Sequence, residues 1–213
     1  MTELPFYLSA EIRWFLGGDV PRDVCDWYNR SPHKHTYPER TDTYLLFPHA
    51  ETVGAKFRED RFEIKSFVRE MDPPVIKDNI VGKIELWEKW SLAGSSVSQL
   101  FKEIQDNKAL WVDVIKTRTL RKYSTDGDDI QEMDASGRQG FPDDGCNVEL
   151  TEITIENKSY WSIGFEAFST KKDLTDNLLL TISLFFESYD IDLKLAEEDS
   201  ISYPAFLRKI RSD

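Results

Sequence analysis

Apolar and polar residues alternate along most of this chain, a pattern typical of strands with two unlike faces. The alternation predicts strands at 6–16, 41–47, 52–58, 61–68, 80–92, 109–123, 147–156 and 160–169. Short turns at 59–60 and 157–159 predict two hairpins among them. Segments 31–40, 70–79 and 125–146 contain prolines, glycines or clustered acids, and we expect them to be loops.

Four other segments have apolar residues at helical spacing, namely 21–30, 95–106, 174–189 and 203–210. In the first, Asp19 is the expected N-cap, and Val24, Trp27 and Tyr28 share one face. Segment 174–189 is strongly apolar, so we expect it to pack against an apolar surface.

Roughly eight strands, a few helices and no dividing linker predict one α+β domain over residues 1–213. A sheet of this size commonly closes on itself, because closure removes the exposed edge strands. We therefore expect a closed antiparallel β-barrel with flanking helices.

Charged residues recur at every second position of several predicted strands, and such residues point to the same side. The pairs are Glu11 and Arg13, Lys56 and Arg58, Glu63 and Lys65, and Lys116 and Arg118, while Glu85 and Lys89 share a face with Trp87 between them. In an ordinary amphipathic sheet these side chains would lie in water. The apolar helices favour the opposite arrangement, in which the apolar face lies outside under the helices and the charges face one lumen.

The net charge of −12 is concentrated in two segments, 125–146 with −6 and 187–199 with −5. An acidic chain is a poor partner for nucleic acids and anionic membranes, so we expect neither. No apolar run reaches the roughly 20 residues of a membrane helix. The two cysteines form no C-x-x-C pair and the start of the chain lacks a secretory pattern, which predicts a cytoplasmic protein. The oligomeric state stays open.

Several cations and a few carboxylates in one cavity suit a small phosphorylated ligand with its divalent metal ion. The order of the segments resembles the triphosphate tunnel metalloenzymes, or CYTH superfamily, which includes inorganic triphosphatases, thiamine triphosphatases and class IV adenylate cyclases. The resemblance rests on Ser9-Ala10-Glu11-Ile12-Arg13, Thr41-Asp42-Thr43-Tyr44, Lys56-Phe57-Arg58, Glu63-Ile64-Lys65, Lys116-Thr117-Arg118, Glu149-Leu150-Thr151-Glu152, Gly164-Phe165-Glu166 and Ser202-Tyr203-Pro204.

This resemblance implies a divergent phosphohydrolase that depends on Mg²⁺ or Mn²⁺ and acts on a triphosphate or organic phosphate compound. It implies phosphate binding by Arg13, Lys56, Arg58, Lys65, Lys116 and Arg118. It implies catalytic carboxylates at Glu11, Glu85 and Glu149, with Glu11 and Glu166 as metal ligands. Three positions depart from the pattern: Ser9 and Gly164 stand where the family offers glutamates, and Arg13 stands where the opening motif has a lysine.

Other functions fit parts of the sequence. The barrel could bind a phosphate or nucleotide ligand without turnover, or it could be a scaffold whose acidic loops meet a basic partner. Asp42 with Glu63 and Lys65 resembles a metal-dependent nuclease site, against which the missing basic surface weighs. A zinc site could be imagined at Cys25, His33, His35 and His49, but a polar loop is the favoured interpretation there.

Overall fold

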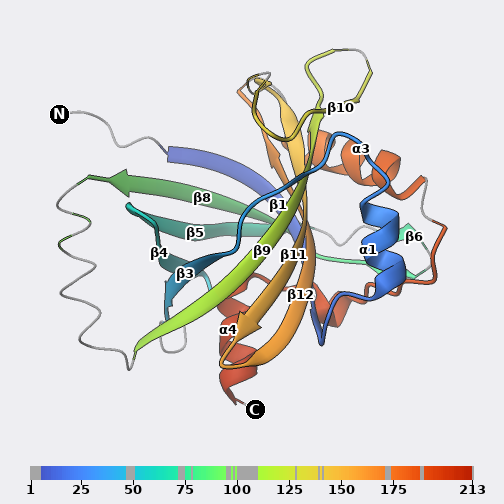
Figure 1. Ribbon diagram of the computed structural model, residues 1–213. Coiled ribbons are helices and arrows are strands. Elements are labelled where there is room, and N and C mark those ends of the chain that lie inside the picture. Colours follow the sequence, from blue (N-terminus) through green and yellow to red (C-terminus); the bar gives the residue numbers. More distant parts are fainter. Residues whose placement is uncertain are drawn as a thin grey trace.

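Eight strands pair edge to edge into a closed antiparallel barrel (Figure 1). The computed structural model describes residues 6–46, 51–71, 75–77, 79–94, 97, 99, 110–127, 129–138, 140, 142–170, 174–187 and 190–212. The barrel strands are β1 (Phe6–Gly17), β3 (Arg40–Leu45), β4 (Val53–Arg58), β5 (Arg61–Met71), β8 (Ile84–Ala93), β9 (Trp111–Ser124), β11 (Gly145–Ile155) and β12 (Lys158–Phe168). Their order is β9, β11, β12, β1, β8, β5, β4, β3, and pairing of β3 with β9 closes the ring. The expected α+β barrel of roughly eight strands is confirmed.

Three short strands occupy parts of the segments expected to be loops. They are β2 (His35–Thr36) and β10 (Gln131–Met133), which pair with β9, and β6 (Val75–Lys77). Strands of two or three residues are too short to show a period, which is why the pattern missed these three. β6 pairs with β7 (Ile80–Val81), which lies in the segment expected to be a strand. Pro73 and Pro74, which marked one expected loop, lie outside the described residues.

Several strand boundaries differ from expectation, among them β5, which continues to Met71, and β11, which already begins at Gly145. The strand expected at 80–92 is interrupted between β7 and β8. Gly82 lies in that gap and packs so closely on Trp14 that a Cβ there would lie 2.5 Å from a ring carbon. The last hairpin turns at Glu156 and Asn157, whose φ angles of 50° and 63° match a tight two-residue loop. β12 therefore starts at Lys158, inside the expected turn.

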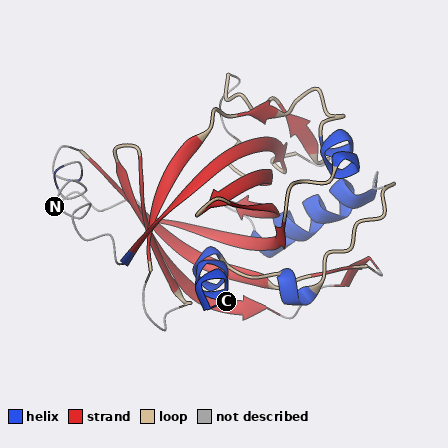
Figure 2. Ribbon diagram, turned by 60° about the horizontal axis from the view of Figure 1, so that its bottom comes forward, coloured by secondary structure: helices blue, strands red, loops and turns tan. Residues whose placement is uncertain are grey.

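Helices cover one side of the barrel and one of its ends (Figures 1 and 2). They are α1 (Arg22–Tyr28), α3 (Leu174–Glu187), α4 (Tyr203–Ser212) and the 3-10 turn η2 (Glu197–Asp199). The expected N-cap Asp19 is wrong, because Pro21 occupies that position and no side chain caps α1. Most of the helix expected at 95–106 falls outside the described residues.

The main hydrophobic core lies outside the barrel wall, between the strands and the helices. Outward residues of β1, such as Ile12 and Trp14, join those of β12, such as Phe165, beneath Phe185 and Phe186 of α3. This arrangement leaves the alternate, charged positions of the same strands facing inward, as the helix argument predicted.

A second core fills one end of the barrel interior. Inward positions change there from charged to apolar: Arg13 is followed on its face by Phe15, and Lys116 is preceded by Val114. Phe206 of α4 stacks on Phe15 with ring centroids 4.1 Å apart. α4 thus packs against the apolar end of the interior, and a polar cavity remains beyond it.

Candidate functional site

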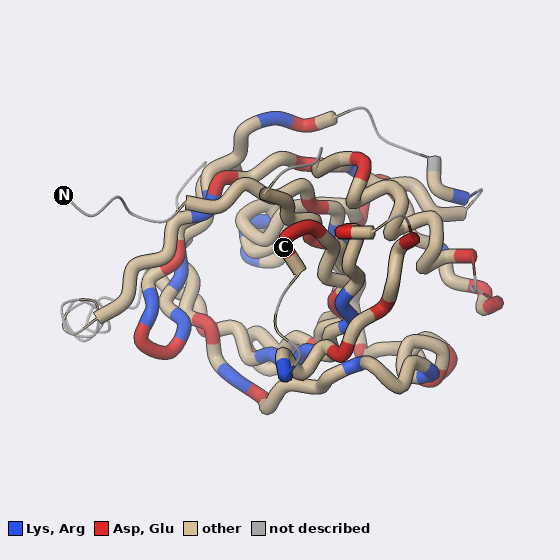
Figure 3. The backbone as a smooth tube through the Cα atoms, turned by 90° about the horizontal axis from the view of Figure 1, so that it is seen from above, with Lys and Arg blue, Asp and Glu red and all other residues tan. Residues whose placement is uncertain are grey.

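A cavity of about 270 Å³ lies inside the barrel, and all eight barrel strands contribute side chains to its lining. Figure 3 shows the backbone running round this centre. The lining carries nine cationic side chains, Arg13, Arg40, Lys56, Arg58, Lys65, Lys83, Lys89, Lys116 and Arg118. It carries five carboxylates, Glu11, Glu63, Glu85, Glu149 and Glu166. In a chain of net charge −12, the cavity lining thus has a formal excess of four positive charges.

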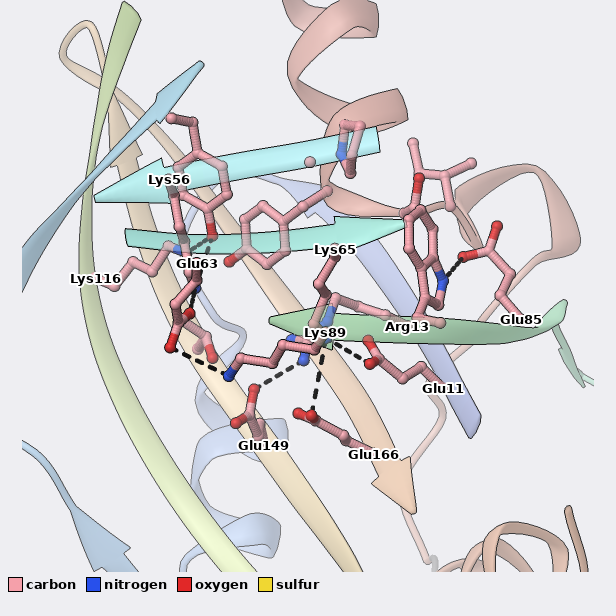
Figure 4. Close-up of a pocket in the computed structure, with 18 of the residues that line it drawn as sticks. Glu11, Arg13, Lys56, Glu63, Lys65, Glu85, Lys89, Lys116, Glu149 and Glu166 are labelled. Atoms are coloured by element: carbon pink, nitrogen blue, oxygen red, sulfur yellow. Dashed lines mark hydrogen bonds and ion pairs between the residues drawn. The ribbon is translucent and has the colours of Figure 1, made fainter. Parts of the chain in front are cut away.

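The structure brings every residue expected at the site to this one cavity. The catalytic, phosphate-binding and metal-binding candidates are Glu11, Arg13, Lys56, Arg58, Lys65, Glu85, Lys116, Arg118, Glu149 and Glu166, and all of them line it. Figure 4 shows how most of them point toward one another from different strands. Their position is observed, whereas their roles stay predictions.

Asp42 of β3 lies at the centre of the densest charge cluster and is fully buried. Arg58 donates two hydrogen bonds to its carboxylate, each 3.0 Å long. Lys116 lies 3.2 Å, Arg40 3.3 Å and Lys56 3.4 Å from the same carboxylate. Burial alone would raise the pKa of Asp42, but Lys56, Lys116 and Arg58 outweigh it and hold the pKa well below its usual range.

The lysines of this cluster are crowded by other cations. Burial, followed by the neighbouring Arg58, lowers the pKa of Lys56 to about 8. Burial also lowers the pKa of Lys116, against the opposing effect of Asp42. The Lys116 ammonium donates a 2.7 Å hydrogen bond to Tyr44 and lies 3.9 Å from the ring centroid of Tyr203. One carboxylate among four cations leaves surplus positive charge for an anionic ligand to neutralise.

Glu63 of β5 extends this cluster across the cavity. Its carboxylate lies 3.2 Å from the Lys56 ammonium, 3.1 Å from that of Lys89 and 3.8 Å from the Arg58 guanidinium. Burial would raise its pKa, but Lys56, Arg58 and Lys89 lower it below the ordinary value. Both acids of the nuclease-like alternative are therefore held by cations.

Glu149 of β11 is clamped between two arginines. Arg13 Nη2 lies 2.8 Å from one oxygen and Arg118 Nη1 lies 2.7 Å from the other. Burial would raise the pKa of Glu149, but Arg118 and Arg13 lower it well below the ordinary value. A Cβ at Gly164 would lie 2.7 Å from Cζ of Arg13. The guanidinium thus occupies the space in which a side chain at position 164 would begin.

Glu11, Glu85 and Glu166 form a row across three adjacent strands. Glu11 of β1 stands opposite Glu166 of β12 and opposite Glu85 of β8. The Lys65 ammonium donates a hydrogen bond to Glu11 and lies 3.8 Å from Glu166. Ser9 donates a second hydrogen bond to the same Glu11 oxygen. Burial would raise the pKa of Glu11, but Lys65 outweighs it and lowers the pKa.

The pKa of Glu85 is raised, to about 7, whereas those of Glu11, Glu63 and Glu149 are lowered. Burial is the main cause, and the nearby Glu11 and Glu70 add to it. Trp87 opposes the shift by donating a 3.0 Å hydrogen bond from its indole nitrogen. Near neutral pH this carboxyl can therefore exchange a proton with a ligand or a water molecule.

The expected metal ligands Glu11 and Glu166 face a lysine ammonium in this structure. No group of three or more His, Cys, Asp or Glu among the described residues is placed to hold one. Glu11 and Glu166, the expected ligand pair, already share the Lys65 ammonium. The zinc alternative gains nothing from the described residues either, and His49 lies outside them.

The sequence did not assign to the binding set several polar residues that the structure places at the site, among them Arg40, Asp42, Tyr44, Glu63, Lys83, Lys89 and Tyr203. The strand residues among them could have been found from alternation. Each lies two or four positions from another cavity residue of its own strand, so the two side chains point to the same face. Tyr203 begins a helix and carries no strand alternation, so only the fold places it beside Lys116.

No protein-family model and no curated protein sequence matches this chain. The resemblance to the triphosphate tunnel superfamily therefore stays a prediction from the order of the sequence motifs. Within the described part of the chain, no helix is both long and apolar enough to cross a membrane.

Proposed function

We propose that this protein binds a short phosphate chain inside its barrel, as a divergent relative of the triphosphate tunnel superfamily. The observation that carries the proposal is the convergence of nine cationic side chains on one cavity in a chain of net charge −12. Arginine and lysine bind phosphate through short, charge-assisted hydrogen bonds, and guanidinium groups do so with two donors at once.

The internal carboxylates keep these cations in place before a ligand arrives. Asp42 fixes Arg58 through two hydrogen bonds, and Glu149 orders Arg13 and Arg118. Cations that are already ordered lose less conformational entropy when they bind, which strengthens binding. Phosphate oxygens would then share or replace the carboxylate oxygens as acceptors.

Hydrolysis of the bound ligand is the catalytic version of this proposal. Glu85 is the candidate base, because it lines the cavity and its raised pKa of about 7 suits proton transfer near neutral pH. It would take a proton from water as the water oxygen attacks phosphorus and the bridging P–O bond breaks, with the departing phosphate taking the electron pair. The Mg²⁺ or Mn²⁺ requirement and the ligand roles of Glu11 and Glu166 stay predictions.

A binder without turnover is the second version, and the ion pairs favour it. Glu149 uses both oxygens on arginines, and Glu11 accepts from Lys65 and Ser9. Acids that are held in this way are poorly placed to orient water.

Calorimetry and thermal unfolding with tripolyphosphate, thiamine triphosphate and ATP test binding, and phosphate release in Mg²⁺, Mn²⁺ or EDTA tests turnover. We expect a rise in Tm with at least one compound. Arg58→Gln should weaken that binding about tenfold or more, whereas Arg61→Gln, which changes an exposed arginine on the same hairpin, should leave it unchanged. Absence of binding by all three compounds would refute the proposal and leave the acidic scaffold.

A further inference from the structure

We propose that the Lys65 ammonium acts as a built-in cation between Glu11 and Glu166, so that the barrel binds a phosphate chain without a divalent metal ion. This inference rests on the proposed function and specifies the ligand state that the cavity accepts. It differs from the requirement for Mg²⁺ or Mn²⁺ that the family resemblance implies.

The geometry of the carboxylate pair carries the inference. Glu11 and Glu166 are direct partners on the neighbouring strands β1 and β12, which places two negative charges side by side inside the barrel. Lys65 reaches them from β5, and its ammonium contacts Glu11 and lies 3.8 Å from Glu166. A divalent ion would need this place, so the ammonium and the metal exclude each other.

The immediate neighbours of the pair also disfavour a metal. One Glu11 oxygen already accepts hydrogen bonds from both Lys65 and Ser9. Ser9 supplies a donor there and no additional carboxylate. Gly164, on the strand that carries Glu166, is covered by the Arg13 guanidinium, whose Cζ lies 2.7 Å from the position of a Cβ at 164. The Lys65 ammonium and the Arg13 guanidinium therefore occupy the places in which further carboxylates would be needed to bind a metal ion.

The charge of the rest of the cavity agrees with direct binding. A phosphate chain arriving without metal brings several negative charges, and the lining has a formal excess of four positive charges to receive them. Asp42, just behind the lining, reduces that excess to three. Surplus cations on the protein thus replace the neutralisation that Mg²⁺ commonly gives to phosphate chains.

The first test compares tripolyphosphate binding to the intact protein by calorimetry in EDTA and in Mg²⁺ or Mn²⁺. We expect binding in EDTA that neither metal tightens. Because Mg²⁺ and Mn²⁺ chelate free tripolyphosphate, they should leave the apparent dissociation constant unchanged or raise it. Binding that is lost in EDTA and restored by either metal would overturn the inference while keeping the proposed function. Absence of binding in every condition would refute the proposed function itself, on which the inference depends.

The second test removes the built-in cation. Lys65→Met keeps most of the apolar stem and frees the carboxylate pair, so the variant should gain Mn²⁺ binding at least tenfold over the wild type, measured by electron paramagnetic resonance without any phosphate compound. Lys89→Met is the matched control, because its ammonium pairs with Glu63 and leaves Glu11 and Glu166 occupied. A folded Lys65→Met protein with no gain in Mn²⁺ binding, or a wild type that binds Mn²⁺ as tightly as the variant, would overturn the inference. If Lys65→Met does not fold, Lys65→Arg should still bind tripolyphosphate in EDTA.

Discussion

At the scale of single residues, Asp42 balances the positive charge of the cavity. Its buried carboxylate is the common acceptor of Arg40, Lys56, Arg58 and Lys116. Removing one member of such a buried network leaves the others without a counter-charge, and this costs about 3–5 kcal/mol.

We therefore expect Asp42→Asn to lower the free energy of unfolding by about 3–5 kcal/mol, measured with urea. Tripolyphosphate should restore more stability to the variant than it adds to the wild type, because it supplies the missing negative charge. Asp113→Asn is the control, since Asp113 is exposed and bonds only to Thr43 among the contacts described. A variant with wild-type stability would show that the four cations do not depend on Asp42.

Glu85 makes stability depend on pH in the direction opposite to that of the paired acids. Its folded-state pKa of about 7 lies above the ordinary 4.5, so between these values the folded protein holds a proton that the unfolded chain has lost. The contribution of Glu85 to the free energy of unfolding is therefore fully present below pH 4.5 and is lost as the pH rises to about 7.

Glu85→Gln removes this proton linkage. The stability of the variant relative to wild type should rise between pH 5 and pH 8 by on the order of 1–3 kcal/mol. Urea unfolding of both proteins at four pH values in this range measures the change. A difference that stays constant with pH would contradict the raised pKa.

At the scale of strands and helices, the sequence predicted the inward and outward faces but not the partners across the barrel. Alternation places Glu11 on a polar face without any other strand being known. That Glu166 stands opposite it depends on the pairing of β1 with β12, which are far apart in the chain. The Lys65 contact with Glu11 likewise depends on the strand order, because β5 and β1 are not paired with each other but lie on either side of β8.

The element least visible in the sequence as part of the site is α4, which brings Tyr203 to Lys116. Its own anchor is apolar: Phe206 is buried, stacks on Phe15 and meets Tyr160 edge-on at 5.3 Å. The hydrophobic contacts of one helix thus set the position of an aromatic group in a charged cavity.

Phe206→Ala should lower the free energy of unfolding by about 3–5 kcal/mol, the usual cost of deleting a buried ring. It should also weaken tripolyphosphate binding, since α4 would no longer hold Tyr203 in place. Urea unfolding and calorimetry measure the two effects. Leu180→Ala, on an α3 face that leaves Leu180 53% exposed, is the control and should change both little. If the variant lost stability but bound tripolyphosphate as tightly as the wild type, α4 would not contribute to ligand binding.

At the scale of the whole molecule, charge and hydrophobicity are arranged inside out relative to an ordinary globular domain. The cavity lining carries a formal excess of four positive charges, so the rest of the chain carries −16. The alternation in the strands and the apolar segment 174–189 together predicted this arrangement. The net charge alone could not, because it is dominated by two acidic segments.

The direction of each side chain can be tested with two neighbours on β11, Cys146 and Asn147. Asn147 lines the cavity, whereas Cys146 points outward into the buried core under α3, and burial raises the pKa of its thiol. Cys25 on α1 is only half-buried. Because thiols react as thiolates and need access to the reagent, only Cys25 should react in the folded protein.

Iodoacetamide treatment followed by mass spectrometry should therefore find one modified cysteine per folded chain, at Cys25, and two after unfolding in urea. Cys25→Ser should leave the folded protein unmodified. If β11 had the opposite phase, Cys146 would face the wet cavity and Asn147 the apolar core. If Cys146 were modified as fast as Cys25 in the folded protein, Cys146 would face the cavity instead of the core. The cationic side chains of the neighbouring strands would then not face a common cavity.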